Sequence, residues 1–149
     1  MLSWVKKAAA GLAALAVLAG TAEAQVPDPF ARELAQRLTR AETLLTENGY
    51  ARAAGPFAGG MPERRARRYT VMLRAGQDYR IVGVCDRRCS DLNLRLFAAS
   101  NQLIAQDVLR DAVPVIHVRP VATGNYDIEV IMERCDDAPC WFAFNVYSR

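Results

Sequence analysis

Four cysteines are the residues of this chain whose type and spacing point most directly to chemistry. They form two close pairs, Cys85 with Cys89 and Cys135 with Cys140, and each pair encloses a short charged loop. Such pairs can form disulfides, bind a zinc ion through their thiolates, or exchange disulfides with other proteins. The compartment in which the protein works decides among these three chemistries.

The N-terminus predicts export from the cytoplasm. Residues 1–7 are positively charged, residues 8–20 are apolar, and small residues follow at the two positions that a signal peptidase reads. We therefore predict that residues 1–24 are a signal peptide with a cleavage site formed by Ala22, Ala24 and Gln25. The apolar run is shorter than the about 20 residues of a membrane span, so we expect no stable membrane insertion after cleavage. An uncleaved anchor helix is the alternative.

Export favours disulfides, because the space outside the cytoplasm is oxidising. Four cysteines allow three connectivities, and the sequence alone does not choose among them. We favour the local pairs Cys85–Cys89 and Cys135–Cys140, since each would close a corner between two predicted strands. A link between the two loops would stabilise by about 4 kcal/mol instead of about 2, which keeps that alternative open. Zinc and thioredoxin-type chemistry usually require two residues between the cysteines, and both spacings here are wider.

The chain shows no catalytic pattern. His117 is the only histidine and lies in the apolar run Val115-Ile116-His117-Val118, where a structural role is expected. A nucleophile elbow, a phosphate-binding loop and a metalloprotease helix are all missing from the sequence. We therefore predict that the protein is not an enzyme.

Acidic residues gather near the predicted strand ends, where carboxylates could hold calcium. The candidates are Asp86, Asp91, Asp107, Asp111, Asp136 and Asp137. Their spacing matches no known calcium loop, so calcium is only a candidate cofactor. The alternative is that these acids offset neighbouring arginines at the surface.

Positive charge is concentrated in the run Arg64-Arg65-Ala66-Arg67-Arg68. The formal net charge of +3 is too small to predict nucleic-acid binding. The run could bind an anionic envelope component, because guanidinium groups hold phosphate and carboxylate groups well. We prefer a solvated run that protects the first strand of the sandwich from edge pairing.

One helix is predicted over residues 28–48. Asp28 can cap it, Pro29 suits its first turn, and Asn48-Gly49 favours a left-handed stop. Its apolar stripe consists of Phe30, Leu34, Leu38, Ala41 and Leu45. We expect this stripe to pack on the rest of the protein. The alternative is that it docks a partner or a second copy.

The remaining chain divides into a linker and a β domain. Residues 50–67 are rich in Gly and Pro, which predicts a linker after the helical segment 25–49. Residues 68–149 alternate apolar and polar side chains in short runs separated by turns, which predicts an antiparallel β-sandwich of about seven to eight strands. The predicted strands are residues 69–73, 79–84, 92–96, 103–108, 113–118, 126–132 and 141–147. In the last of these, Trp141 and Tyr147 share one face, and Phe142, Phe144 and Val146 share the other.

Three segments carry a family resemblance. Residues 73–79 (LRAGQDY), 90–97 (SDLNLRLF) and 123–130 (TGNYDIEV) together resemble the bacterial pre-peptidase C-terminal domain. The resemblance covers roughly residues 68 to 147 and implies a jelly-roll β-sandwich of extracytoplasmic, accessory character. Asn93 stands where the family has a second acid, and no peptidase precedes the domain, so the resemblance implies no enzyme.

The sequence thus predicts an exported, periplasmic or secreted, non-catalytic β-sandwich that acts as a binding or accessory module. Its partner would be a protein or an envelope component. The alternative function is a structural or assembly protein that uses its N-terminal helix to dock a partner or to self-associate.

Overall fold

The computed structural model describes residues 25–149. Ala22 and Ala24 of the predicted cleavage site lie outside these residues, and Gln25 is the first residue described and is exposed. Within this range, no helix combines the length and the apolarity that crossing a membrane requires.

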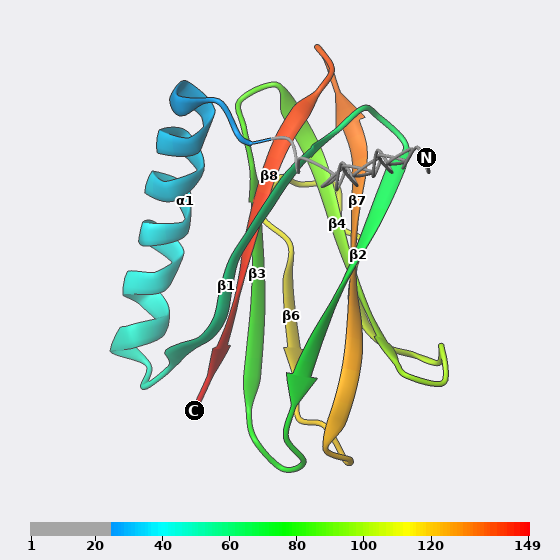
Figure 1. Cartoon of the computed structure of the whole chain (residues 1–149). Coiled ribbons are helices and arrows are strands. Elements are labelled where there is room, and N and C mark those ends of the chain that lie inside the picture. The colour runs from blue at the N-terminus through cyan, green and yellow to red at the C-terminus, as the bar shows by residue number, and fades with distance from the viewer. Residues whose placement is uncertain (1–24) are drawn as a thin grey trace, which may run out of the picture.

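The described chain is one helix followed by eight strands in two four-stranded antiparallel sheets (Figure 1). Sheet A has the order β1 (Ala51–Met61), β8 (Cys140–Ser148), β3 (Tyr79–Cys85) and β6 (Val115–Val118). Sheet B has the order β2 (Arg65–Leu73), β7 (Gly124–Cys135), β4 (Cys89–Ala98) and β5 (Leu103–Asp107). The predicted mostly-β architecture is confirmed.

The main core lies between the two sheets. Phe142, Phe144 and Val146 on β8 point into it, and Leu92, Leu94 and Leu96 on β4 meet them from sheet B. Alternate residues of β8 point to the outer face of sheet A, as the period of two requires. There Trp141 and Tyr147 belong to separate apolar clusters beneath the helix, so their predicted position on the opposite face from Phe142 is confirmed.

Helix α1 (Asp28–Glu47) covers the outer face of sheet A (Figure 1). Leu34 and Leu38 are buried against Val84, Trp141 and Ala143. Further along the helix, Ala41 and Leu45 pack against Tyr50, Val82 and Tyr147. The helical stripe therefore packs on its own sandwich, which is the arrangement that we favoured from the sequence.

The ends of α1 differ slightly from expectation. Pro27 occupies the N-cap position and Asp28 begins the helix, without a side-chain cap. Asp28 still lies in the first turn, where a carboxylate interacts favourably with the helix dipole. At the other end, Gly49 has a φ of 82°, which confirms the predicted left-handed stop.

The predicted linker over residues 50–67 is wrong. Most of it is β1, which pairs with β8, and its last residues begin β2, so the sandwich starts at Ala51 rather than at residue 68. The glycines are needed because β1 passes close to bulky neighbours. A Cβ on Gly60 would lie 2.7 Å from the Trp141 ring, and Gly55 has a φ of 104°. Gly and Ala here mark close packing rather than a flexible linker.

Candidate functional site

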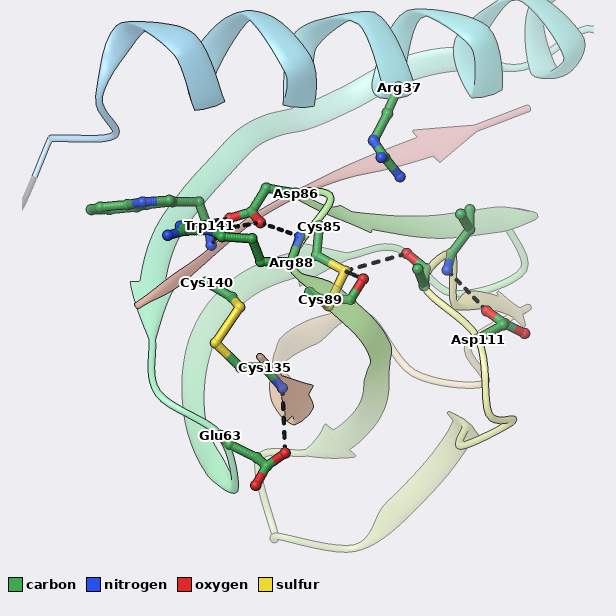
Figure 2. The surroundings of a disulfide bond; sticks show 12 residues. Arg37, Glu63, Cys85, Asp86, Arg88, Cys89, Asp111, Cys135, Cys140 and Trp141 are labelled. Carbon is green, nitrogen blue, oxygen red and sulfur yellow. Dashed lines mark hydrogen bonds and ion pairs between the residues drawn. A yellow bond between two sulfur atoms is a disulfide. The ribbon is translucent and has the colours of Figure 1, made fainter. Parts of the chain in front are cut away.

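The four cysteines form two local disulfides, Cys85–Cys89 and Cys135–Cys140. The predicted pairing is thus the one in the structure, and the cross-linked alternative is not. Cys89 and Cys135 are register partners on β4 and β7, which brings both disulfides to one end of the sandwich (Figure 2). We call this end, residues 85–89 and 135–140, the disulfide corner.

Asp86 organises the disulfide corner from inside. Its side chain is fully buried, and its carboxylate accepts hydrogen bonds from the backbone N–H of Trp141 at 2.6 Å and of Arg88 at 2.8 Å. The Arg88 guanidinium also donates to it at 3.3 Å. Burial by itself would raise the pKa of Asp86, but the hydrogen bonds from Arg88 and Trp141 outweigh it and hold the pKa below its usual value.

Arg88 joins the two disulfide loops and the helix. Its guanidinium donates to the carbonyl oxygen of Pro139 at 2.6 Å and forms an ion pair with Asp137 at 3.6 Å. The same group lies 4.2 Å from the centre of the Phe30 ring on α1. Phe30 in turn stacks on Trp141 at a centroid distance of 6.5 Å. The N-terminal half of α1 is therefore held by the Cys85–Cys89 loop as well as by the sheet.

A second link runs from the disulfide corner along α1. Arg87, inside the Cys85–Cys89 loop, forms an ion pair with Glu33 at 3.5 Å. Glu33 also accepts a hydrogen bond at 2.8 Å from Arg37, one helical turn further on. One carboxylate is thus shared by two arginines, and a net positive charge remains.

The disulfide corner also contacts the segment that joins β5 to β6. Sγ of Cys85 lies 3.8 Å from the carbonyl oxygen of Ala112. Asp111 fixes the same segment through two hydrogen bonds of 2.9 Å. Its backbone carbonyl accepts one from the N–H of Leu92, and its carboxylate accepts the other from the N–H of Val113. Asp107 holds the start of β6 through the N–H of Val115 at 2.8 Å.

Between α1 and this segment lies a groove of about 550 Å³. It is lined by Glu33, Gln36, Arg37, Arg40, Ala41, Leu44, Val84 and Val113, which we call the α1–β6 groove. Val84 of β3 lies between the helix on one side and Val113 on the other. Because the Cys85–Cys89 loop contacts both sides, the predicted disulfide positions this groove. Figure 2 shows Arg37 on the helix above the disulfide corner.

Exposed apolar side chains are concentrated in one stretch of the sequence, which contributes Val113 to the groove. Six of the nine large hydrophobic residues that are exposed in the described chain lie within residues 103–115, which we call the apolar segment. They are Leu103, Ile104, Val108, Leu109, Val113 and Val115. Contiguous exposed apolar surface is typical of interaction sites. Sequence alternation placed the strands but did not show which side chains remain uncovered.

Four of the six acids proposed as calcium ligands have other side-chain contacts. Asp86, Asp107 and Asp111 accept the hydrogen bonds described above, and Asp137 pairs with Arg88. In residues 25–149, no group of three or more side chains capable of holding a metal gathers at one place. Calcium binding therefore remains a prediction.

Asp91 differs from the other acids because it is buried and forms no ion pair within residues 25–149. It shares a small polar pocket with Glu63 and Glu133 and with three arginines, Arg64, Arg110 and Arg134. Burial raises the pKa of Asp91, and the negative charge of Glu133 adds to the rise.

His117 contacts Asp78, and the arginine run lies largely on an edge strand. The Nε2 atom of His117 lies 2.6 Å from an oxygen of Asp78, and its side chain is about half exposed. Arg65, Arg67 and Arg68 are exposed on β2, an edge strand of sheet B. This position agrees with the predicted role in protecting a strand edge.

The comparison with protein-family models gives no match, and neither does the comparison with curated proteins. The resemblance to the pre-peptidase C-terminal domain therefore remains a prediction. Among solved structures, a crystal structure of PliG from Aeromonas hydrophila, a periplasmic inhibitor of g-type lysozyme, is similar with a TM-score of 0.49 and 16% identity. The similarity covers 64% of this chain and 85% of that chain. At this level it assigns neither a family nor a ligand to this chain.

Proposed function

We propose that this protein is an exported, non-catalytic binding module that holds a protein partner on the α1–β6 groove and the apolar segment. The observation that carries the proposal is that six of the nine exposed large hydrophobic residues of the described chain fall within residues 103–115, the segment that contributes Val113 to the groove. Surfaces of this kind are typical of protein interfaces, where an apolar centre is bordered by arginines and polar groups.

Two disulfides support work outside the cytoplasm. Disulfides persist in oxidising compartments and are rare in the cytosol. Both disulfides lie at the end of the sandwich that positions the groove, so the oxidised form of the protein is the form with the assembled site. A periplasmic or secreted location follows from this proposal.

The chemistry of the described residues supports a non-catalytic role. All four cysteines are in disulfides, so no thiol is free to act as a nucleophile. The single histidine is engaged with Asp78 at the end of the molecule where β3 begins. The groove is lined by apolar, amide and charged side chains and lacks serine, cysteine and histidine.

The alternative, assembly through the helical stripe, has less support. Leu34 and Leu38 are already buried beneath α1, and only Leu44 on the helix leaves a large apolar side chain exposed. An assembly contact would therefore have to use the groove side of the helix.

We also infer that the sandwich is a jelly roll. The strand orders β1-β8-β3-β6 and β2-β7-β4-β5 support this. Strands β1 to β4 lie alternately in sheet A and sheet B, and so do strands β8 to β5 when the chain is followed backwards from its C-terminus, as in a jelly roll.

Site-specific photo-crosslinking tests the binding function. A photoreactive residue is placed in the full chain at Val113, at Leu109 or at Val121, which is 99% exposed and lies outside the apolar segment. We expect a defined protein adduct in living cells at Val113 and Leu109 but not at Val121. The captured protein is then purified, and Leu109→Asp should weaken its binding to the mature chain by at least about tenfold, while Val121→Asp should not. Equal adducts at all three positions, or none at any, would contradict the proposed function.

A further inference from the structure

We propose that the partner presents an acidic polypeptide segment with an apolar anchor side chain to the α1–β6 groove. This inference rests on the proposed function and adds the chemistry of the partner. It depends on the charges along α1 and on the apolar surface between them and the β5–β6 connection.

Arginines line the helical side of the groove with little compensation. Arg37 and Arg87 share the single carboxylate of Glu33, at 2.8 and 3.5 Å. Arg40, one turn along the helix from Gln36, has no ion pair among the contacts of residues 25–149 and is exposed. The groove is therefore positive, and a partner with carboxylates would bind there more readily than a basic one.

Asp107 and Asp111, in the segment that leads to Val113, accept hydrogen bonds from backbone N–H groups of that segment and of β6. The carboxylate of Asp111 accepts a hydrogen bond from the N–H of Val113, and the carboxylate of Asp107 accepts hydrogen bonds from the N–H groups of Leu109 and Val115. No ion pair in residues 25–149 joins either carboxylate to Arg37 or Arg40, and Glu33 is the single acid that lines the groove. A carboxylate of a partner could therefore pair with these arginines.

The floor and rim supply an apolar contact for one side chain. Val84 forms part of the floor, and Val113 and Leu44, 45% and 64% exposed, stand on opposite rims. The volume of about 550 Å³ lies in the range of sites that hold a compact ligand group. A leucine or phenylalanine of the partner would cover Val113 and Leu44, while a neighbouring glutamate or aspartate would reach Arg37 or Arg40. Burying the apolar surface around an arginine–carboxylate pair also strengthens that pair, because water is excluded.

Peptide titration tests this chemistry. The probes are three labelled synthetic peptides of equal length, one alternating Glu with Leu, one Lys with Leu and one Glu with Ser. They are titrated into the mature protein and followed by fluorescence anisotropy. We expect the Glu–Leu peptide to bind measurably and the other two peptides not to bind. The affinity of the Glu–Leu peptide should fall as the salt concentration rises.

Matched charge reversals locate the site. Arg40→Glu should weaken binding of the Glu–Leu peptide by at least about tenfold, while Arg65→Glu, the same change on the distant strand β2, should leave it within about twofold. Equal binding of the acidic and basic peptides, or equal effects of the two reversals, would overturn the proposal. Binding to vesicles of anionic phospholipid without binding to the Glu–Leu peptide would overturn it as well.

The photo-crosslinking and peptide-titration experiments distinguish a failure of the binding function from a failure of the acidic-partner proposal. A protein captured at Val113 together with no preference for acidic peptides would leave the binding function in place and reject only the acidic partner. Absence of any captured protein would reject the binding function itself.

Discussion

The guanidinium of Arg88 donates a 2.6 Å hydrogen bond to the carbonyl oxygen of Pro139, 51 residues further along the chain. This contact connects the two disulfide loops, and the same guanidinium is held by buried Asp86 and covers Phe30 of the helix. One arginine thereby unites both disulfides and α1. The stability of the disulfide corner and the position of the groove should depend on it.

We predict that Asp86→Asn lowers the free energy of unfolding by about 2–4 kcal/mol, because it leaves Arg88 and the N–H of Trp141 without a charged acceptor in a buried site. Chemical denaturation at neutral pH measures the loss. Asp137→Asn is the control, since its side chain is 80% exposed and should change the stability by no more than about 0.5 kcal/mol. Similar losses for both variants would show that Asp86 does not organise the corner.

The stability should also depend on the ionisation of Asp86. Its pKa is lowered in the folded protein, so its carboxylate stabilises fully above the unfolded pKa of about 3.9 and loses this effect as pH falls through the folded pKa. We expect Asp86→Asn to reduce the difference between the unfolding free energies at pH 7 and pH 2.5. An unchanged difference would count against the hydrogen-bonded carboxylate.

Asp91 should behave in the opposite sense. Its pKa is raised by burial and by Glu133, so the folded protein favours the protonated form, and that stabilisation is lost as pH rises through the folded pKa. We predict that Asp91→Asn increases the unfolding free energy at pH 7 and leaves it nearly unchanged at pH 2.5. Denaturation curves at both pH values measure this, and a loss at pH 7 would show that Asp91 makes a stabilising ionic contact.

The helix should be held on sheet A chiefly by its buried leucines. Leu38 is 6% exposed and packs with Val84 and Trp141, so Leu38→Ala should cost about 2–4 kcal/mol. Trp141 is the single tryptophan in residues 25–149, so the tryptophan fluorescence of this part of the chain reports on the contact. We expect a red-shifted emission in Leu38→Ala. Leu44→Ala, with the same change on the exposed side of α1, should alter neither the emission nor the stability by a measurable amount.

The two disulfides should differ in their effect on the groove. Replacing either pair by serine should cost about 2 kcal/mol, since each closes a short loop. Loss of Cys85–Cys89 should also raise amide hydrogen exchange in residues 108–114, because Cys85 contacts Ala112. Loss of Cys135–Cys140 should leave that exchange unchanged. Equal protection in both double variants would mean that the Cys85–Cys89 loop does not position the groove.

Much of the fold followed from local patterns. Three features depend only on residues close in sequence, and the structure contains them all. They are the period of two in the β strands, the helical spacing of Leu34, Leu38 and Leu45, and the turn at Gly49. Local proximity also made the two disulfide pairs predictable. Strand β1 was missed because glycine has a low strand propensity, whereas Gly55, Gly59 and Gly60 are required here by the close approach of neighbours such as the Trp141 ring.

The sequence by itself determined that a helix is followed by short antiparallel strands, with two cysteine pairs at strand ends. Only the tertiary structure decided that both pairs meet at one end, that Asp86 is buried beneath Arg88, and that the apolar residues between 103 and 115 remain uncovered. The reason is physical. Periodicity reports which face of an element is apolar, but burial depends on what distant segments cover it, and here α1 covers β8 and β3 while leaving the border with β6 open.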